Sequence, residues 1–252
     1  MNSYLKNLSK IEFVVSYACT GRCIHCSEGD HELNGERIEP SVAADAVCRI
    51  CRDYDIKTVM AFGGEPLLYV DAVYAIMQAA LESNVPLRQI ITNGYFTSNV
   101  SRMREVAERL SDCGVNDLLL SVDAFHQQTI PLETVRSFAI EAKRANIPMR
   151  LQPAWLVSRD DNNSYNKRTR EILESLSDLS IAVGEGNVVF PEGNAARYLA
   201  EFFVHAKPEN PYETDPYDVR CISFSPNGDV LGANAYTSDV IEILENYTPS
   251  MQ

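Results

Sequence analysis

Three cysteines stand close together in the sequence and could jointly hold a metal. Cys19, Cys23 and Cys26 form a C-x3-C-x2-C run directly after an apolar segment. Thiolates are soft ligands that select zinc, copper(I) or iron–sulfur clusters. A structural zinc site needs four ligands, and no comparable loop carries a close cysteine pair to complete it. Three thiolates on a [4Fe–4S] cluster would leave one iron open to a small molecule, which favours a catalytic cluster. A redox-inactive metal site and three incidental cysteines are the alternatives.

The other cysteines differ in their surroundings. Cys48 and Cys51 are three residues apart within an apolar stripe of helical spacing, so a place in the core is favoured over a second metal site. Cys113 ends another helical segment and is expected to be structural. Seven cysteines in a chain without an export signal indicate thiols that are kept reduced, which predicts a cytoplasmic protein.

The elements that must position these residues alternate between strand and helix. Short and nearly continuous apolar segments predict six buried parallel strands. Their ranges are 11–17, 57–63, 88–92, 117–122, 148–155 and 181–190. Apolar residues at helical spacing follow each segment, so the pattern predicts a mostly parallel sheet, either open and doubly wound or closed as a barrel. In both architectures the chemistry belongs at the carboxyl ends of the strands.

The composition limits the classes of partner. Twenty-two basic against 35 acidic residues give a net charge of −13, whose field repels phosphate and disfavours nucleic acid or anionic membranes as partners. No stretch approaches the roughly 20 apolar residues of a membrane-spanning helix. A neutral, small or basic substrate is favoured instead.

The cysteine run resembles the cluster signature of the radical S-adenosylmethionine (radical SAM) superfamily. Further elements support the resemblance: Gly63-Gly64-Glu65-Pro66 matches the family's GGEP element, and Thr92-Asn93-Gly94 and Ser121-Val122-Asp123 end the third and fourth strands. The resemblance covers about residues 11–205. It implies an α/β fold, a partial (β/α)6 TIM-type barrel, that holds a [4Fe–4S] cluster and S-adenosylmethionine (SAM).

The resemblance also implies roles for individual residues. Cys19, Cys23 and Cys26 would bind the cluster, and Glu65 would accept hydrogen bonds from the amino group of SAM. The expected SAM-binding residues are His25, Gly63, Gly64, Glu65, Pro66, Thr92, Asn93, Ser121, Asp123, Arg150, Gln152 and Val189. His126 is expected to act as a general acid or base, or to contact the substrate. The alternatives are ring packing for His25, a loop histidine with a structural partner for His126, ion pairing within the fold for Arg150, and a helix-start carboxylate for Glu65.

The last part of the chain is expected to form an extension. We predict a barrel over residues 1–205 and a linker with a β-hairpin over 206–252, folded over the gap between the edge strands. Cys221 before Pro226-Asn227-Gly228 resembles the start of the auxiliary-cluster (SPASM/twitch-like) extensions of peptide-modifying radical SAM enzymes. No cysteine follows it, which predicts a single cluster. Cys221 is then either a thiol hydrogen donor at the active site or a buried remnant.

These observations favour a radical SAM enzyme. It would cleave SAM reductively to a 5′-deoxyadenosyl radical that abstracts hydrogen from a substrate, with an electron donor such as reduced flavodoxin or ferredoxin as partner. A peptide substrate is slightly favoured over a nucleoside-like or other small metabolite. A non-catalytic iron–sulfur regulator is the alternative, and the intact cysteine run together with GGEP speaks against it.

Overall fold

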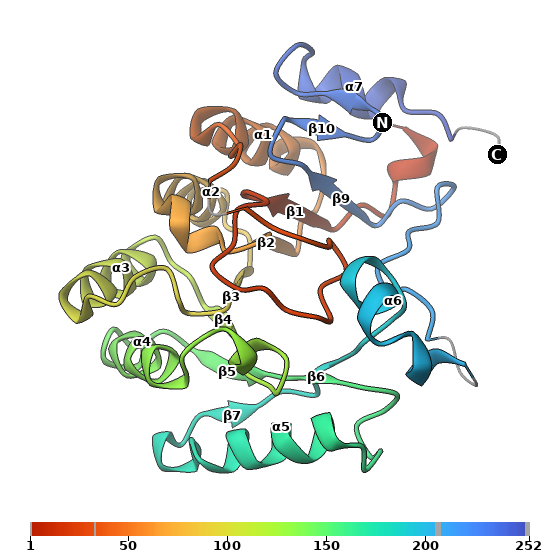
Figure 1. Ribbon diagram of the computed structural model, residues 1–252. Coiled ribbons are helices and arrows are strands. Elements are labelled where there is room, and N and C mark those ends of the chain that lie inside the picture. Colours follow the sequence, from red (N-terminus) through yellow and green to blue (C-terminus); the bar gives the residue numbers. More distant parts are fainter. Residues whose placement is uncertain (1, 33, 205–207, 250–252) are drawn as a thin grey trace.

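The computed structural model describes residues 2–32, 34–204 and 208–249. A seven-stranded sheet forms its centre, in the order β7-β5-β4-β3-β2-β1-β9 (Figure 1). Its strands are β1 (Lys10–Val14), β2 (Thr58–Phe62), β3 (Leu87–Thr92), β4 (Asp117–Ser121), β5 (Met149–Gln152), β7 (Ala182–Val183) and β9 (Cys221–Phe224). All neighbouring pairs in this sheet are parallel. The sheet has two free edges, at β7 and β9, so the partial TIM-type barrel expected from the sequence is confirmed.

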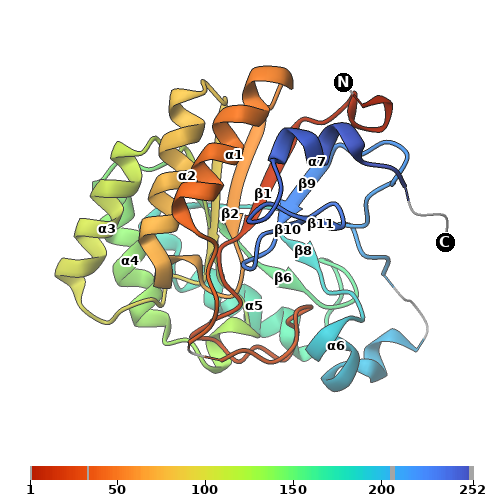
Figure 2. The same cartoon turned by 90° about the horizontal axis from the view of Figure 1, so that it is seen from above.

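Helices follow the strands. They are α1 (Pro40–Asp53), α2 (Val70–Glu82), α3 (Val100–Asp112), α4 (Leu132–Arg144), α5 (Ser164–Glu174), α6 (Gly193–Tyr198) and α7 (Val240–Asn246). All except α6, which lies beside the loop that carries the cysteine run, pack around the outside of the sheet. Short 3-10 turns lie at Ser3–Leu5, Pro66–Tyr69, His126–Gln128, Ser177–Leu179 and Ala200–Phe203. Figure 2 shows α1 to α4 side by side along one face of the sheet. The other face lines the inside of the partial barrel.

Alternation along the strands separates these two faces. Ile11 and Phe13 of β1 are fully buried and belong to the same apolar core as Ile50 of α1 and Ile76 of α2. Lys10 and Glu12 point to the opposite face, as the period of two along a strand requires, and are only partly buried. The apolar core therefore fills the layer between sheet and helices, and polar side chains reach the barrel interior.

The fifth and sixth expected strands are each divided in two. β5 ends before Pro153, which has no N–H to donate to a ladder, and β6 (Ala154–Trp155) begins after it. The sixth segment breaks at Gly184 and Gly186 into β7 and β8 (Asn187–Val188). β6 and β8 pair with each other in a separate two-stranded sheet, so the wall of the barrel splits at this edge.

The chain after the linker returns to the main sheet. β9 pairs in parallel with β1, and the rings of Phe13 and Phe224 stack with centroids 4.9 Å apart. A hairpin is formed by β10 (Asp229–Val230) and β11 (Ala233–Asn234), which pair antiparallel. Residues 205–207, at the boundary expected from the sequence, lie outside the described residues. A strand from the C-terminal part of the chain, β9, is therefore in the same sheet as the first strand, β1.

The hairpin does not lie across the gap between the edge strands, so that expectation was wrong. It packs beside α1, where the backbone N–H of Glu39 donates to the hydroxyl of Tyr236 at 2.9 Å. Arg49 of α1 forms a 2.6 Å ion pair with Asp239, the N-cap of α7. The sequence also favours a hairpin in which residues 222–225 and 230–231 flank the Pro226–Asp229 turn, and this expectation was wrong, because residues 221–224 are paired with β1 and residues 229–230 with β11.

Candidate active site

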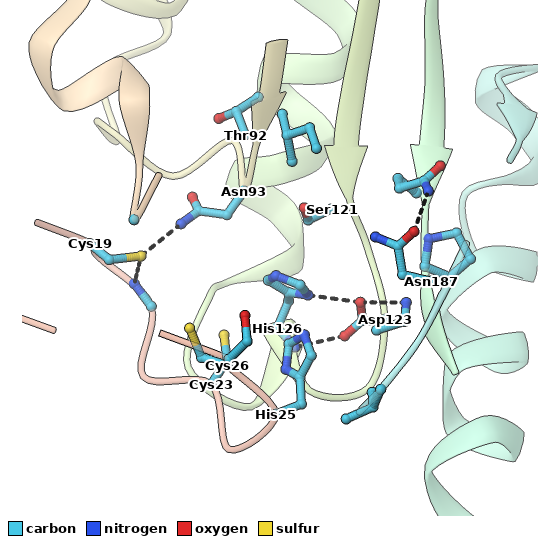
Figure 3. Close-up of a pocket in the computed structure, with 18 of the residues that line it drawn as sticks. Cys19, Cys23, His25, Cys26, Thr92, Asn93, Ser121, Asp123, His126 and Asn187 are labelled. Atoms are coloured by element: carbon cyan, nitrogen blue, oxygen red, sulfur yellow. Dashed lines mark hydrogen bonds and ion pairs between the residues drawn. The ribbon is translucent and has the colours of Figure 1, made fainter. Parts of the chain in front are cut away.

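A cavity of about 210 Å³ opens at the carboxyl ends of the parallel strands (Figure 3). Expected site residues that line it are Cys19, Cys23, His25, Cys26, Gly63, Gly64, Thr92, Asn93, Ser121, Asp123, His126, Gln152 and Val189. These residues come from the loop after β1 and from the ends of β2 to β5 and β8. Because parallel strands end on the same side of a sheet, the fold brings together residues that are far apart in the sequence.

The cysteine loop turns its three thiols toward this cavity. Gly21 lies against two of them: a Cβ at this position would stand 3.3 Å from Sγ of Cys23 and 3.6 Å from Sγ of Cys19. Sγ of Cys19 accepts hydrogen bonds from the backbone N–H of Gly21 at 3.3 Å and from the side-chain amide of Asn93 at 3.5 Å. The loop is therefore shaped by contacts to its sulfur atoms and anchored to the end of β3.

The surroundings of the three thiols disfavour their ionisation. Burial raises the pKa of Cys19 to about 11, with a further rise from the nearby Glu65 carboxylate. Burial also raises the pKa of Cys23 and of Cys26, and neighbouring anions add to both shifts. Three such groups become thiolates together only when a cation offsets their charge, and bound iron supplies that charge. The chemistry of the donor set fits an iron–sulfur cluster.

The turn after β2 is hydrogen-bonded to the backbone that leads into the cysteine loop. The N–H of Gly64 donates to the carbonyl of Ser16, and the N–H of Glu65 donates to the carbonyl of Ala18, both at 2.8 Å. Gly63 has φ +140°, and a Cβ there would stand 2.5 Å from the carbonyl oxygen of Ser16. Only glycines permit this approach, which holds the loop and the turn at one wall of the cavity.

We expect Gly64→Ala to disrupt this contact, because its Cβ would stand 2.3 Å from the carbonyl oxygen of Ala18. Overpacking of this kind lowers the free energy of unfolding by about 1–3 kcal/mol, and here it also displaces the cysteine loop. Iron content after anaerobic reconstitution and the melting temperature should both fall. Gly35→Ala is the matched control, since its nearest neighbour is also in Ala18 but at 3.5 Å. Equal behaviour of the two variants would contradict this expectation.

Glu65 has a different place from the one expected. Its side chain is 0% exposed and is not among the residues that line the cavity. The carboxylate accepts hydrogen bonds from the N–H of Leu67 at 2.9 Å, the hydroxyl of Thr92 at 2.7 Å and the N–H of Asn93 at 2.8 Å. Pro66, which begins the following 3-10 turn, is also buried away from the cavity. The carboxylate thus joins the ends of β2 and β3 from behind the cavity wall.

An aspartate and two histidines form the opposite wall. Asp123 is 0% exposed, and its Oδ2 lies 2.8 Å from Nδ1 of His126. The ring of His25 packs on Phe125 at 4.7 Å and meets the edge of His126 at 4.8 Å. Burial lowers the pKa of His25 to about 4, with a further contribution from His126, so His25 is a neutral ring at physiological pH. The ring of His25 therefore packs as the structural alternative for this residue predicts.

Besides Glu65 and Pro66, two further expected site residues are not brought to the cavity. Arg150 points down the barrel, where its guanidinium forms a 2.8 Å ion pair with Asp117, as the ion-pairing alternative required. Cys221 is the register partner of Lys10 at the amino end of β1, whereas the cysteine loop follows the carboxyl end of that strand. Burial raises the pKa of the Cys221 thiol to about 12, and Glu12 adds to the rise. Cys221 is thus at the opposite end of the sheet.

Sequence reasoning missed several cavity residues, including His31, Asn187 and Tyr212. Nε2 of His31 lies 3.1 Å from Sγ of Cys26, and Nδ1 lies 2.7 Å from the carbonyl oxygen of Tyr17. A histidine shortly after a cysteine run was a usable signal for His31. Tyr212 reaches the cavity from the linker, where its ring meets Phe190 edge-on at 6.0 Å, and no local sequence pattern predicts such a contact.

The fold and the site agree with a comparison to family models. Residues 13–150 match the model of the radical SAM superfamily, so the chain belongs to that superfamily. The superfamily consists of enzymes that use a [4Fe–4S] cluster and SAM, and these are the cofactors of this chain. The thiols and the glycine turn at one cavity fit both. None of the described helices is long and apolar enough to cross a membrane.

Relatives in sequence are named as nucleotide cyclases. The probable GTP 3′,8-cyclase of Methanocaldococcus jannaschii is 23% identical over 49% of this chain and 39% of its own length. The probable GTP 3′,8-cyclase of Saccharolobus solfataricus is 25% identical over 77% of this chain and 64% of its own length. The chain thus spans well under two thirds of the first of these relatives.

Solved structures share the fold at low sequence identity. Streptococcus suis SuiB bound to S-adenosylmethionine has a TM-score of 0.60 at 14% identity, over 95% of this chain and 66% of that one. Native anSMEcpe with bound AdoMet has a TM-score of 0.57 at 14% identity, over 92% of this chain and 76% of that one. At this identity the likeness concerns the fold.

Proposed function

We propose that this chain is a radical SAM enzyme that holds its cluster with Cys19, Cys23 and Cys26. The observation that carries the proposal is the convergence of these three thiols and the Gly63–Gly64 backbone on one cavity. When bound and reduced by one electron, the cluster supplies the electron that cleaves SAM to methionine and a 5′-deoxyadenosyl radical. That radical takes a hydrogen atom from a carbon of the substrate.

The residues of the chain bind and orient SAM at the strand ends. The backbone of Gly63 and Gly64 approaches the cavity closely enough to contact the methionine part of SAM. Ser121 and Gln152 offer a hydroxyl and an amide to its ribose and carboxylate, and Val189 offers an apolar surface to its adenine. Holding these groups of SAM in fixed positions orients the reacting atoms. It also keeps water away from a primary carbon radical.

For the substrate, we propose a small polar metabolite ahead of a peptide. The names of the relatives in sequence refer to reactions of a nucleotide, which supports a small molecule. The peptide hypothesis rested on the C-terminal segment, which packs into the main sheet and beside α1. An electron donor such as reduced flavodoxin or ferredoxin would serve as partner. The seven free thiols fit a reducing compartment, and we propose the cytoplasm.

The experiment that tests this function is an anaerobic SAM-cleavage assay. The chain is reconstituted with iron and sulfide, mixed with SAM and dithionite, and analysed for 5′-deoxyadenosine by liquid chromatography and mass spectrometry. We expect 5′-deoxyadenosine from the loaded chain and none from Cys23→Ala. A chain that loads a cluster yet never cleaves SAM would instead be a non-catalytic iron–sulfur protein, and the proposed enzyme activity would be wrong.

A further inference from the structure

Asp123 is a buried carboxylate whose oxygens are fully engaged by the protein. Oδ1 accepts hydrogen bonds from the backbone N–H groups of Phe125 and His126, both at 2.9 Å. Oδ2 accepts from the N–H of Ala154 at 3.0 Å and lies 2.8 Å from Nδ1 of His126. Burial raises the pKa of this carboxyl, but His126 and the donated hydrogen bonds outweigh it and lower the pKa to about 2. Asp123 is therefore an acceptor toward every neighbour.

An acceptor-only partner determines where the imidazole of His126 carries its hydrogen. A 2.8 Å contact between a carboxylate oxygen and Nδ1 requires a hydrogen on Nδ1. In the neutral ring, the other nitrogen, Nε2, is then without a hydrogen and can only accept. The sequence places Asp123 and His126 three residues apart at the end of β4, so a local turn sets this arrangement.

The ring of His126 is held with its free edge toward the cavity. His126 lines the cavity together with Cys23 and Cys26, and Figure 3 marks the contact of its ring with Asp123 by a dashed line. His25 packs against it edge-on and is itself supported by Phe125, which stacks on Tyr165 at 4.8 Å. Within the described residues, Nδ1 is the only ring nitrogen of His126 with a protein partner.

We propose that Asp123 is a positioning residue that fixes the Nδ1–H tautomer of His126, so that Nε2 accepts a hydrogen bond from a hydroxyl or amino group bound in the cavity. The proposal deepens the proposed function, on which it rests for the contents of the cavity. It replaces the direct contact between Asp123 and SAM that the sequence suggested, because the carboxylate oxygens already have partners. The donor group belongs either to SAM, whose ribose carries hydroxyls, or to a substrate with an O–H or N–H group.

The test is histidine nitrogen NMR on the full chain. The chain is labelled with ¹⁵N-histidine, loaded with the oxidised cluster, and recorded at pH 8, where an ordinary imidazole is neutral. Long-range proton–nitrogen correlations distinguish the two tautomers, and His126→Gln assigns the signal. We expect the wild-type ring to carry its hydrogen on Nδ1. A hydrogen on Nε2 in the wild type would overturn the proposal even if no variant could be folded.

Two substitutions make the test specific to Asp123. In Asp123→Asn, the amide NH2 donates to Nδ1, so the hydrogen should shift to Nε2. Asp117→Asn is the matched control, because it removes a carboxylate from the other end of β4 that contacts Gln89 and Arg150 rather than a histidine. It should leave the tautomer of His126 unchanged. An unchanged tautomer in Asp123→Asn would overturn the positioning role.

Addition of SAM to the labelled wild type separates the two sources of the donor. A shift of the Nε2 signal assigns the hydrogen bond to SAM, and an unshifted signal with SAM bound assigns it to the substrate. Binding of SAM is measured separately by equilibrium dialysis. Failure of the proposed function would appear as absent cluster or absent SAM cleavage, whereas failure of this inference would appear only in the tautomer.

Discussion

Replacement of Cys23 by alanine should abolish iron loading, whereas Cys221→Ser should still bind about four irons per chain, the content of one [4Fe–4S] cluster. The two cysteines have the same chemistry but lie at different positions in the fold. Cys23 is in the loop that faces the cavity, and Cys221 pairs with Lys10 at the amino end of β1. Iron and sulfide per chain, measured after anaerobic reconstitution, decide between them.

The same pair of variants tests whether one cluster is present. Cys221→Ser should also support wild-type SAM cleavage, because the structure keeps that thiol away from the cavity. About eight irons per wild-type chain, falling to about four in Cys221→Ser, would overturn the single-cluster hypothesis and restore an auxiliary site. Iron retained by Cys23→Ala would show that the loop thiols are not the ligands.

The part of the site that could be predicted from the sequence is the part set by strand ends. Cys19, Gly64, Asn93 and Ser121 each follow or close a strand, and parallel strands must deliver such residues to one edge of the sheet. The alternation of apolar segments was enough to predict β1 to β4 and their parallel direction. Neither inference needed side-chain detail.

What the sequence could not show depends on pairing over long distances. The C-terminal segment has turn residues typical of a local hairpin, but β9 pairs with β1, some 200 residues away, because its apolar residues complete the main core. The position of Cys221 was predicted wrongly for the same reason. A sequence motif shows which residues are neighbours along the chain but not at which end of the sheet they lie. Arg150 was equally undecided, because either Asp117 or a ligand could balance the charge of its guanidinium.

Glu65→Ala should be among the most destabilising single substitutions in this protein. The change removes the shared acceptor of three donors: the N–H groups of Leu67 and Asn93 and the hydroxyl of Thr92. Each buried donor left without a partner costs about 1–3 kcal/mol, so we expect a loss of at least about 3 kcal/mol in the free energy of unfolding. Urea unfolding under anaerobic conditions measures it.

Glu141→Ala is the matched control for this loss. Glu141 on α4 is also a buried glutamate, at 3% exposed, and it is likewise held by more than one donor. Its partners, Arg104 and Arg144, have side chains that are 53% and 63% exposed, so their guanidinium groups reach water when the carboxylate is gone. The loss in Glu141→Ala should therefore be clearly smaller. Equal losses would mean that the three donors around Glu65 find other partners.

The charge of Glu65 adds a dependence on pH that distinguishes it from an ordinary structural carboxylate. Burial raises its pKa from 4.5 to about 7, although the hydrogen bonds from Thr92, Leu67 and Asn93 act to lower it. Because the folded state binds the proton more tightly than the unfolded state, this contribution is complete below pH 4.5 and is lost as the pH rises through 7. Relative to Glu65→Gln, which cannot ionise, the wild type should therefore lose on the order of 3 kcal/mol between pH 4.5 and pH 8. Urea unfolding of both proteins across this range measures the difference, and a difference that stays constant with pH would show that Glu65 is ionised throughout in the folded protein.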